Sequence, residues 1–521
     1  MNPVILIDQE PVTAGEGKTL NGLGRASRLQ GLFEGGSTLL LASIFGNGMN
    51  YLFMMFLARQ LGMEEFGLYA LGITVFNTLL LLLTTGVDSG TVKFVSDRLA
   101  FSDHVAARRM AVGACLVAAG VGLILGIGLA FAATPVATYA YRKTGLAPIL
   151  FLFAGALPFA MVTTLLLAAI QAYQSVRATA LVKYVWEPLC KWGAAVLAVA
   201  AGWGLVGVIG GLVVTFIIST LLAAVILVRV AQVPLHAVTT MSQDDARTFA
   251  AFCFPLLAAN LFGVVAPRMD VMLLGYWASS VDVGRYLIAF QTAAVLALVL
   301  GAFDVVFAPM MSRAWAKRDE AELGDAYRAL HRLTAMATVP VFVIVIIFRE
   351  EVLALFGGGA GEASAALAIL ATGYLVNALL GGASTVLLMT GRSRIVLLNT
   401  IAYGIGLGLG ATLLIPPWGM AGAAVAASAT LVGVNVLRAW QVWHCHAMFP
   451  WTWQTLKPLA GGFTMSLLLW LAKPYLDPLW FVPLAGIGAM TYCASLYLLR
   501  LENDDQMMVS ATLTRWLPVR S

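Results

Sequence analysis

The chain has 521 residues, of which 60% are hydrophobic and 11% are charged, and its net charge is +5. Soluble globular domains are about 45–50% apolar and about 25% charged, so this composition excludes a soluble protein and indicates one that crosses a membrane many times. The 5 cysteines share no spacing that would indicate a disulfide framework or a zinc site. The positive charge does not indicate nucleic acid binding, because Lys and Arg in such chains reflect loop orientation.

Apolar stretches, taken in chain order, predict about fourteen membrane-spanning helices, because each span needs about 20 apolar residues. Their expected limits are 37–60, 66–90, 110–133, 147–170, 181–201, 205–229, 250–276, 284–311, 333–349, 363–390, 394–415, 419–442, 458–472 and 479–499. The sequence therefore predicts an all-α polytopic membrane protein.

We expect six parts: a cytoplasmic polar tail, a lobe of six helices, a cytoplasmic linker, a second lobe of six helices, helices 13 and 14, and a cytoplasmic tail. Their expected ranges are 1–36, 37–229, 230–249, 250–443, 444–500 and 501–521. Most Lys and Arg residues fall in loops of one face, which by the positive-inside rule predicts that both termini are cytoplasmic. The expected outer loops hold Arg59, Arg142, Lys143, Arg285, Arg349 and Lys473.

Two short patterns each occur twice, and the spacing between the copies is nearly the same for both. Phe-Gly-Leu-Tyr at 66–69 follows the first expected helix, and Val-Gly-Arg-Tyr at 283–286 follows the seventh. Trp-Gly-Leu-Val-Gly-Val at 203–208 is echoed by Trp-Gly-Met-Ala-Gly-Ala at 418–423. The recurrence predicts a duplicated unit of six helices, with an axis along the membrane normal relating the copies. The alternative is chance recurrence in a chain with 51 glycines.

The stretch 251–290 carries charge inside an expected span. Arg268 and Asp270 would each cost about 2.5–3.5 kcal/mol at the bilayer centre, so they are expected to face a cavity or a partner. They lie about 200° apart around a helix and cannot simply neutralise each other side by side. Pro267 removes a backbone donor and predicts a kink beside the charge. A bent, charged helix within the membrane indicates transport.

Other polar residues lie along the expected helices. Asn47 and Asn50 form part of a polar stripe on helix 1, as Asn77 and Asp88 do on helix 2. Such stripes need either a wet cavity or polar neighbours on other helices, and both interpretations stay open. Asp304 follows Asp88 at the spacing of the two repeated patterns, in agreement with the repeat.

Two charged residues of helix 5 allow two interpretations. Glu187 and Lys191 are spaced i,i+4, the favoured order for an ion pair that neutralises itself. Alternatively, Lys191 faces a cavity as one of the few cations within the membrane.

Three segments resemble a known family. Leu-Ala-Arg-Gln-Leu-Gly-Met-Glu-Glu-Phe-Gly-Leu-Tyr at 57–69 resembles the first outer hairpin of bacterial polysaccharide repeat-unit flippases, the Wzx-type branch of the multidrug/oligosaccharidyl-lipid/polysaccharide exporter superfamily. The segments 268–276 and 388–424 are similar to that family as well. The resemblance covers helices 1 to 12. It implies two six-helix lobes around a central cavity that opens alternately to each face.

The resemblance also implies a cargo and a location. The cargo would be a polyprenyl-pyrophosphate-linked oligosaccharide, moved from the inner to the outer leaflet of the bacterial inner membrane for O-antigen (lipopolysaccharide), capsule or exopolysaccharide synthesis. Membrane lipids, and a polysaccharide polymerase with a chain-length regulator, are the implied partners. Related branches flip the peptidoglycan precursor or export drugs with a coupling cation, and both remain alternatives. Fourteen helices suit the peptidoglycan branch and the larger polysaccharide members.

On this resemblance, roles can be assigned to the residues above. Arg268 and Lys191 would attract the pyrophosphate, and asparagine amides would bind sugar hydroxyls. The candidate substrate-binding residues are Arg268, Lys191, Asn47, Asn50, Asn77, Asn260 and Asn377. The candidate coupling or gating residues are Asp270, Asp88, Asp304 and Glu187. Asp270 would bind a coupling proton or sodium ion, or would orient Arg268.

No cofactor and no enzymatic activity are expected. The chain lacks the Gly-x-x-x-x-Gly-Lys-[Ser/Thr] phosphate loop, so ATP hydrolysis is not expected. The longest expected outer connections, 134–146 and 350–362, hold few titratable groups, which argues against a membrane enzyme of the same pathway. The membrane potential alone would favour outward movement of a pyrophosphate by about 2.3 kcal/mol per charge per 100 mV.

Overall fold

The computed structural model describes residues 17–231, 241–475 and 480–499, and within these ranges every regular element is helical. The prediction of an all-α membrane protein is therefore confirmed. Ten helices of the described part are long and apolar enough to span a membrane, or eleven if the bent pair Gln243–Leu257 and Asn260–Trp277 counts as one more. Two of these helices, α1 and α15, are each a pair joined across a kink, at Gly62 and at Gly419.

The N-terminal lobe begins with the longest helix, α1 (Gly17–Thr84), which bends sharply at Gly62, where φ is 78°. The other elements are α2 (Val87–Ala100), α3 (His104–Pro135), η1 (Val136–Ala140), α4 (Leu146–Ala172), α5 (Val176–Leu181), η2 (Val182–Trp186), α6 (Glu187–Ala200) and α7 (Gly204–Ala231). Helix α1 starts inside the segment expected to be a polar tail. That segment has no proline from residue 17 to residue 36, so nothing in it stops the helix.

The C-terminal lobe begins with α8 (Gln243–Val265), earlier than expected, because the hydroxyl of Ser242 accepts the Asp245 N–H and caps the helix. It continues with η4 (Ala266–Arg268), α9 (Met269–Trp277), α10 (Ser280–Ala316), α11 (Glu320–Ile347), α12 (Arg349–Ala354), η5 (Ala360–Ala363), α13 (Ser364–Leu380), α14 (Gly382–Met389) and α15 (Ser393–His446). The final helices, α16 (Trp453–Ala472) with η6 (Lys473–Tyr475) and α17 (Phe481–Leu498), pack beside α11.

Glycines of the second repeated pattern occupy equivalent backbone positions in the two lobes. Gly204 opens α7 with φ 58°, and Gly419 kinks α15 with φ 52°. The next glycine of each pattern has no room for a Cβ. A Cβ at Gly207 would overlap the Trp203 side chain, and one at Gly422 would overlap the Leu414 carbonyl oxygen. The recurrence therefore reflects a repeated structure, as expected for two pseudo-symmetric lobes.

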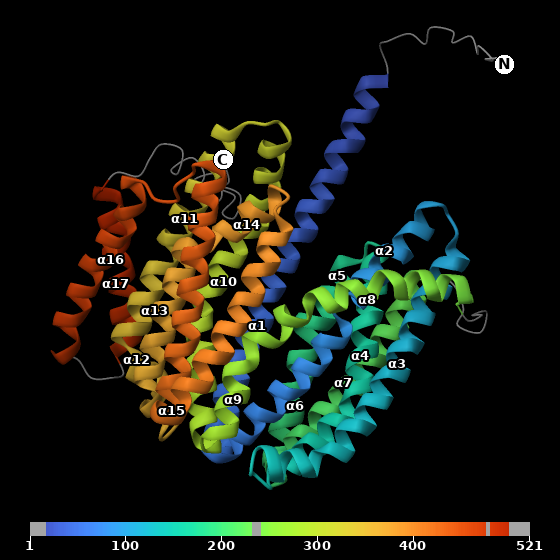
Figure 1. Cartoon of the computed structure of the whole chain (residues 1–521), viewed down its shortest axis with the longest axis horizontal. Helices are drawn as coiled ribbons and strands as arrows, with labels where there is room; N and C mark the ends of the chain where they lie inside the picture. Colours follow the sequence, from blue (N-terminus) through green and yellow to red (C-terminus); the bar gives the residue numbers. More distant parts are fainter. Residues whose placement is uncertain (1–16, 232–240, 476–479, 500–521) are drawn as a thin grey trace.

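The two lobes converge at one end of the molecule, around the kink of α1 and helix α9, and spread apart toward the other end, as Figure 1 shows. We name the convergent end the Gly62 end. Helix α8 crosses from the N-terminal lobe toward α9 (Figure 1), and its first half lies along α2. There Arg98 pairs with Asp245 at 2.7 Å, and Phe94 packs against Phe249 and Phe252.

Candidate functional site

The charged segment lies where α8 gives way to α9. Pro267, where a kink was expected, sits within the 3-10 turn η4, in which the Met269 N–H bonds to the Ala266 carbonyl. The larger bend, of 54°, lies upstream at the break between Leu257 and Asn260. The helix thus bends before it reaches Arg268 and Asp270, and the 3-10 turn η4 lies between the bend and Asp270.

Asp270 is buried within the C-terminal lobe. Its side chain lies on α9 and is 1% exposed. One carboxylate oxygen accepts the Tyr286 hydroxyl of α10 at 2.6 Å, and the other accepts its neighbour's N–H, that of Val271, at 2.7 Å. Tyr374 on α13 and Tyr403 on α15 lie near the same carboxylate. Asp270 is therefore the centre of a tyrosine-lined polar cluster.

Arg268 and Asp270 have separate partners. Nη1 of Arg268 donates to the Val264 carbonyl, one turn earlier on the same helix, at 2.7 Å. The guanidinium is half-buried, whereas the carboxylate is enclosed. The separate partners agree with the expected angular separation of Arg268 and Asp270 around the helix. No direct hydrogen bond joins the two described side chains, so Asp270 does not orient Arg268 through such a bond.

The N-terminal lobe carries no charge at the equivalent positions. The offset that relates Phe66 to Val283 also relates Tyr51, Phe53 and Tyr69 to Arg268, Asp270 and Tyr286, in that order. Phe53 and Tyr69 form an aromatic pair with ring centroids 6.5 Å apart, in place of the carboxylate and its tyrosine. The charged pair is thus an asymmetry between two copies of one unit.

Lys191 lies on α6, with its Nζ 5.8 Å from the Phe216 ring. Next to it, the Trp192 indole donates to the Met49 carbonyl of α1 at 3.0 Å, which places this part of α6 beside the exposed side chains of Asn47 and Asn50. Among the described residues, no ion pair joins Glu187 to Lys191. Helix α6, which carries Lys191, therefore contacts the part of α1 that carries Asn47 and Asn50.

The remaining asparagines are placed differently. Asn77 is half-buried on the second half of α1. The Asn260 amide donates to the Leu256 carbonyl of its own helix at 2.9 Å, and the Asn377 oxygen accepts the Asn435 amide at 2.9 Å. Asn377 therefore joins α13 to α15, which matches the alternative of polar contacts between helices.

The two repeat-related aspartates have different roles. Asp88 accepts the Gly86 N–H at 2.9 Å and the Ser89 N–H at 2.6 Å, which closes the turn that opens α2. Asp304 accepts the Thr385 hydroxyl at 2.8 Å and joins α10 to α14. Both contacts stabilise helix positions, and neither lies in the cluster around Asp270.

Sequence reasoning missed several members of the polar clusters. Tyr286, Tyr403 and Asn435 were not among the candidates, although each contacts or faces one. Arg438, which was not a candidate either, lies near Tyr403 and donates to Asn435. The repeat was a usable signal for Tyr286, because it is the tyrosine of the second Gly-x-Tyr pattern.

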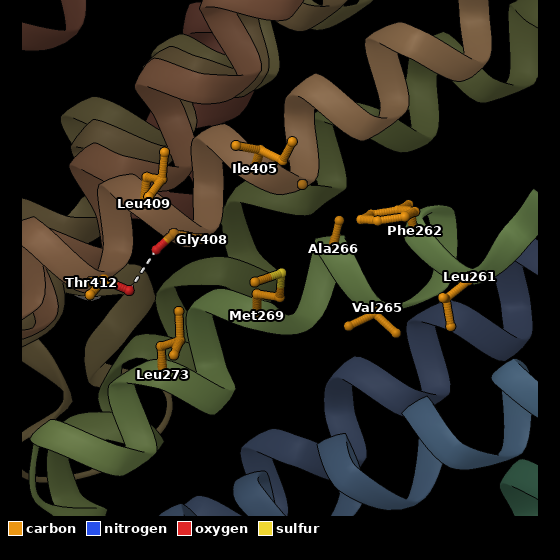
Figure 2. Close-up of a pocket in the computed structure, with 11 residues that line it drawn as sticks. Leu261, Phe262, Val265, Ala266, Met269, Leu273, Ile405, Gly408, Leu409 and Thr412 are labelled. Atoms are coloured by element: carbon orange, nitrogen blue, oxygen red, sulfur yellow. Dashed lines mark hydrogen bonds between the residues drawn. The ribbon is translucent and has the colours of Figure 1, made fainter.

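An apolar groove of about 540 Å³ lies between the α8–α9 segment and the first half of α15 (Figure 2). Its lining residues are Leu261, Phe262, Val265, Ala266, Met269, Leu273, Gly404, Ile405, Gly408, Leu409 and Thr412. The one hydroxyl in this set, on Thr412, donates to the Gly408 carbonyl at 2.7 Å and is thereby satisfied. The groove adjoins Arg268 along the chain and presents apolar surface.

The family model described as "Polysaccharide biosynthesis protein" matches residues 32–315, more than half of the chain. The chain belongs to this family. A second model, MatE, matches residues 255–414 in the C-terminal lobe. No curated protein sequence gives a significant match.

Solved transporter structures share the fold of this family member. The "Lipid II flippase MurJ, inward closed conformation" superposes with a TM-score of 0.72 at 15% identity, covering 88% of this chain and 98% of that one. An inward-facing multidrug resistance MATE family transporter of the MOP superfamily gives 0.64 at 15% identity, covering 77% and 94%. An outward-facing one gives 0.54 at 14% identity, covering 79% and 95%. The prediction of superfamily membership is confirmed, and the chain is a multi-pass membrane protein with the fold of flippase transporters.

Proposed function

We propose that this protein flips polyprenyl-pyrophosphate-linked oligosaccharide repeat units from the inner to the outer leaflet, for assembly of a surface polysaccharide. The observation that carries the proposal is the family match combined with Arg268 in a bent helix within the membrane, where the other lobe has Tyr51. A charged side chain within the membrane costs free energy, and binding of an anionic cargo explains why one lobe carries such a cation. The lobes then enclose a central cavity that opens to each face in turn.

The termini are proposed to lie in the cytoplasm, so that the Gly62 end faces outward. The excess of Lys and Arg in the loops of the opposite face supports this orientation. The better superposition on an inward-facing relative, with a TM-score of 0.64 against 0.54 for an outward-facing one, supports a state in which the Gly62 end is closed.

In this proposal, Arg268 binds the pyrophosphate. A guanidinium has five N–H donors, and the bond to the Val264 carbonyl uses one side of the group, which leaves donors for phosphate oxygens. Lys191 supplies a second positive charge. Asn47 and Asn50, which are exposed on α1, offer amides to sugar hydroxyls.

Energy for the movement is proposed to come from the membrane potential, with Asp270 as the residue that would bind a coupling proton or sodium ion. Its burial beside the Tyr286 hydroxyl supports an ion-binding role, because a buried carboxylate without a cation is costly. The polymerase and chain-length regulator of the pathway are the proposed partners.

The second candidate function is flipping of the peptidoglycan lipid precursor. The observation that favours it is the superposition on the lipid II flippase over 98% of that chain. Both cargoes are polyprenyl pyrophosphates, so Arg268 would serve either. The MatE match in the C-terminal lobe raises a third candidate, cation-coupled drug export.

One experiment separates these functions. The purified protein is reconstituted in liposomes that hold a polyprenyl-pyrophosphate oligosaccharide, the peptidoglycan precursor or a cationic dye, and an imposed potential drives transport. We expect movement of the oligosaccharide lipid, detected as new accessibility to a membrane-impermeant glycan oxidant. Movement of the precursor or the dye alone would overturn the proposal.

A further inference from the structure

Cations at the Gly62 end cap the carboxyl ends of helices or their following loops. The last carbonyls of a helix lack intrahelical partners and carry partial negative charge, so a cation there is stabilising. Four residues of the expected outer loops make such contacts in the described structure: Arg59 with Leu355, Lys143 with Gly275 and Ala278, Arg285 with Gly359, and Lys473 with Ile347.

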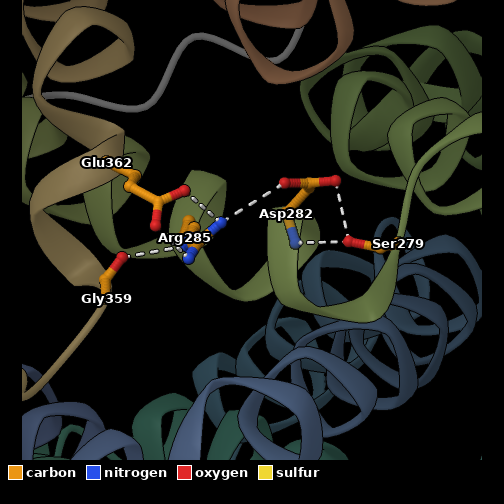
Figure 3. A network of polar contacts seen from close by, with 5 residues as sticks. All are labelled: Ser279, Asp282, Arg285, Gly359 and Glu362. Carbon is orange, nitrogen blue, oxygen red and sulfur yellow. Dashed lines mark hydrogen bonds and ion pairs between the residues drawn. The ribbon is translucent and has the colours of Figure 1, made fainter.

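Two of these contacts remain within the C-terminal lobe. Lys473 donates to the Ile347 carbonyl, at the end of α11, at 2.7 Å and pairs with Glu351. Figure 3 shows Arg285 between the Gly359 carbonyl and the Glu362 and Asp282 carboxylates. These two cations fix loops of one lobe and do not depend on how the lobes meet.

The other two contacts join the lobes. Lys143, in the loop between η1 and α4 of the N-terminal lobe, donates to the Gly275 carbonyl at 2.6 Å and to the Ala278 carbonyl at 2.9 Å, at the end of α9. Arg59 of α1 donates to the carbonyl of Leu355, the residue that ends α12, at 2.6 Å. Each therefore satisfies carbonyls of the opposite lobe.

The Lys143 ammonium is held in a desolvated position. Burial lowers its pKa from the ordinary value, and the nearby Asp282 carboxylate partly offsets that effect. Seating the charge here costs free energy. The Gly275 and Ala278 carbonyls offset that cost while α9 is in place, whereas the third acceptor, the Tyr141 carbonyl at 3.2 Å, belongs to the same loop as Lys143. Separation of the lobes would return the ammonium to water and leave the end of α9 uncapped.

The backbone around the Lys143 contact is closely packed against the opposite lobe. A Cβ at Gly275 would overlap the Leu71 side chain of α1 and lie 3.0 Å from the Tyr141 ring. A Cβ at Gly67 would overlap the carbonyl oxygen of Ser280. Lys143 therefore reaches α9 beside a close contact between the two lobes.

We propose that Arg59 and Lys143 form a latch that holds the two lobes closed at the Gly62 end by capping α12 and α9 across the interface. The latch does not depend on the cargo or on the direction of transport, so it stands apart from the proposed function. Lys473 is the matched control, because it makes the same kind of contact within one lobe.

The test measures the distance between the lobes in lipid nanodiscs by pulsed electron paramagnetic resonance. Spin labels replace Tyr139 of the N-terminal lobe, which is 84% exposed, and Gly361 of the C-terminal lobe, where an added Cβ meets nothing within 4 Å. The five native cysteines are first replaced. The compared proteins are the parent, the double variant R59M/K143M and the control K473M.

The latch predicts that R59M/K143M raises the ratio of long to short distances about tenfold, as expected for the loss of two helix caps, while K473M leaves it unchanged. An unchanged distribution in R59M/K143M, or an equal shift in K473M, would overturn the proposal. If the double variant does not elute as a folded monodisperse species, the single variants R59M and K143M carry the test. Each is then expected to shift the ratio in the same direction by a smaller factor.

Discussion

The backbone of Gly67 in α1 lies against the backbone of Gly284 in α10. A Cβ on Gly284 would lie 2.9 Å from the Met63 carbonyl oxygen and 3.2 Å from the Gly67 Cα. The two glycines are equivalent residues of the repeat, each the glycine of its Gly-x-Tyr pattern. Contact between equivalent residues places this point near the axis that relates the lobes, so the closed Gly62 end depends on the absence of side chains there.

Alanine at Gly67 is expected to hold the Gly62 end open, because its Cβ would overlap the Ser280 carbonyl oxygen. The same pair of spin labels at positions 139 and 361 is expected to show mainly the longer distance in G67A. Gly48 of the same helix is a suitable control, since an added Cβ there meets nothing within 4 Å. Closure of G67A to the parent distance would contradict the expectation.

Removal of the Arg268 guanidinium is expected to abolish most transport. We expect R268A to lower the rate of oligosaccharide-lipid flipping about 10- to 100-fold, the effect of losing charge-assisted hydrogen bonds to a phosphate. Lysine at the same position should retain part of the activity, because it keeps the charge but loses the planar donor pair. Arg394, which is exposed at the start of α15, provides the control R394A. Normal flipping by R268A at parental expression would remove this residue from the site.

Loss of the Tyr286 hydroxyl is expected to destabilise the C-terminal lobe. It leaves a buried Asp270 oxygen without its 2.6 Å donor, at a cost of about 1–3 kcal/mol. Thermal unfolding in detergent should show a lower melting temperature for Y286F. The control is Y69F, the repeat-related change in the N-terminal lobe, where the tyrosine packs on Phe53 and Phe66. Equal shifts in both variants would argue against a special role for the carboxylate.

The sequence was sufficient for the helices and for the repeat. Spans are readable because the apolar membrane interior demands long apolar helices, and the glycine patterns are readable because Gly204 and Gly419 need the same unusual backbone conformation. The start of α1 at Gly17 was missed, because hydropathy reports the membrane boundary and not the end of the hydrogen-bonded helix.

The partners of polar residues were not readable from the sequence. Orientation of Arg268 was one of the two roles expected for Asp270, but the hydroxyl partner of Asp270 comes from the next helix. Lys143 was counted only as a loop cation, because its acceptors are distant in the chain and belong to the other lobe. Such contacts depend on how helices pack, which one helix's periodicity does not specify.

Depletion of the protein from its own cells tests the proposed flipping of oligosaccharide lipids most directly. Polyprenyl-linked glycans are extracted and identified by mass spectrometry, and their leaflet is assigned with a membrane-impermeant glycan label. We predict that a pyrophosphate-linked oligosaccharide accumulates on the inner leaflet. Unchanged oligosaccharide lipids, with accumulation of the peptidoglycan precursor or with new drug sensitivity, would contradict the proposal.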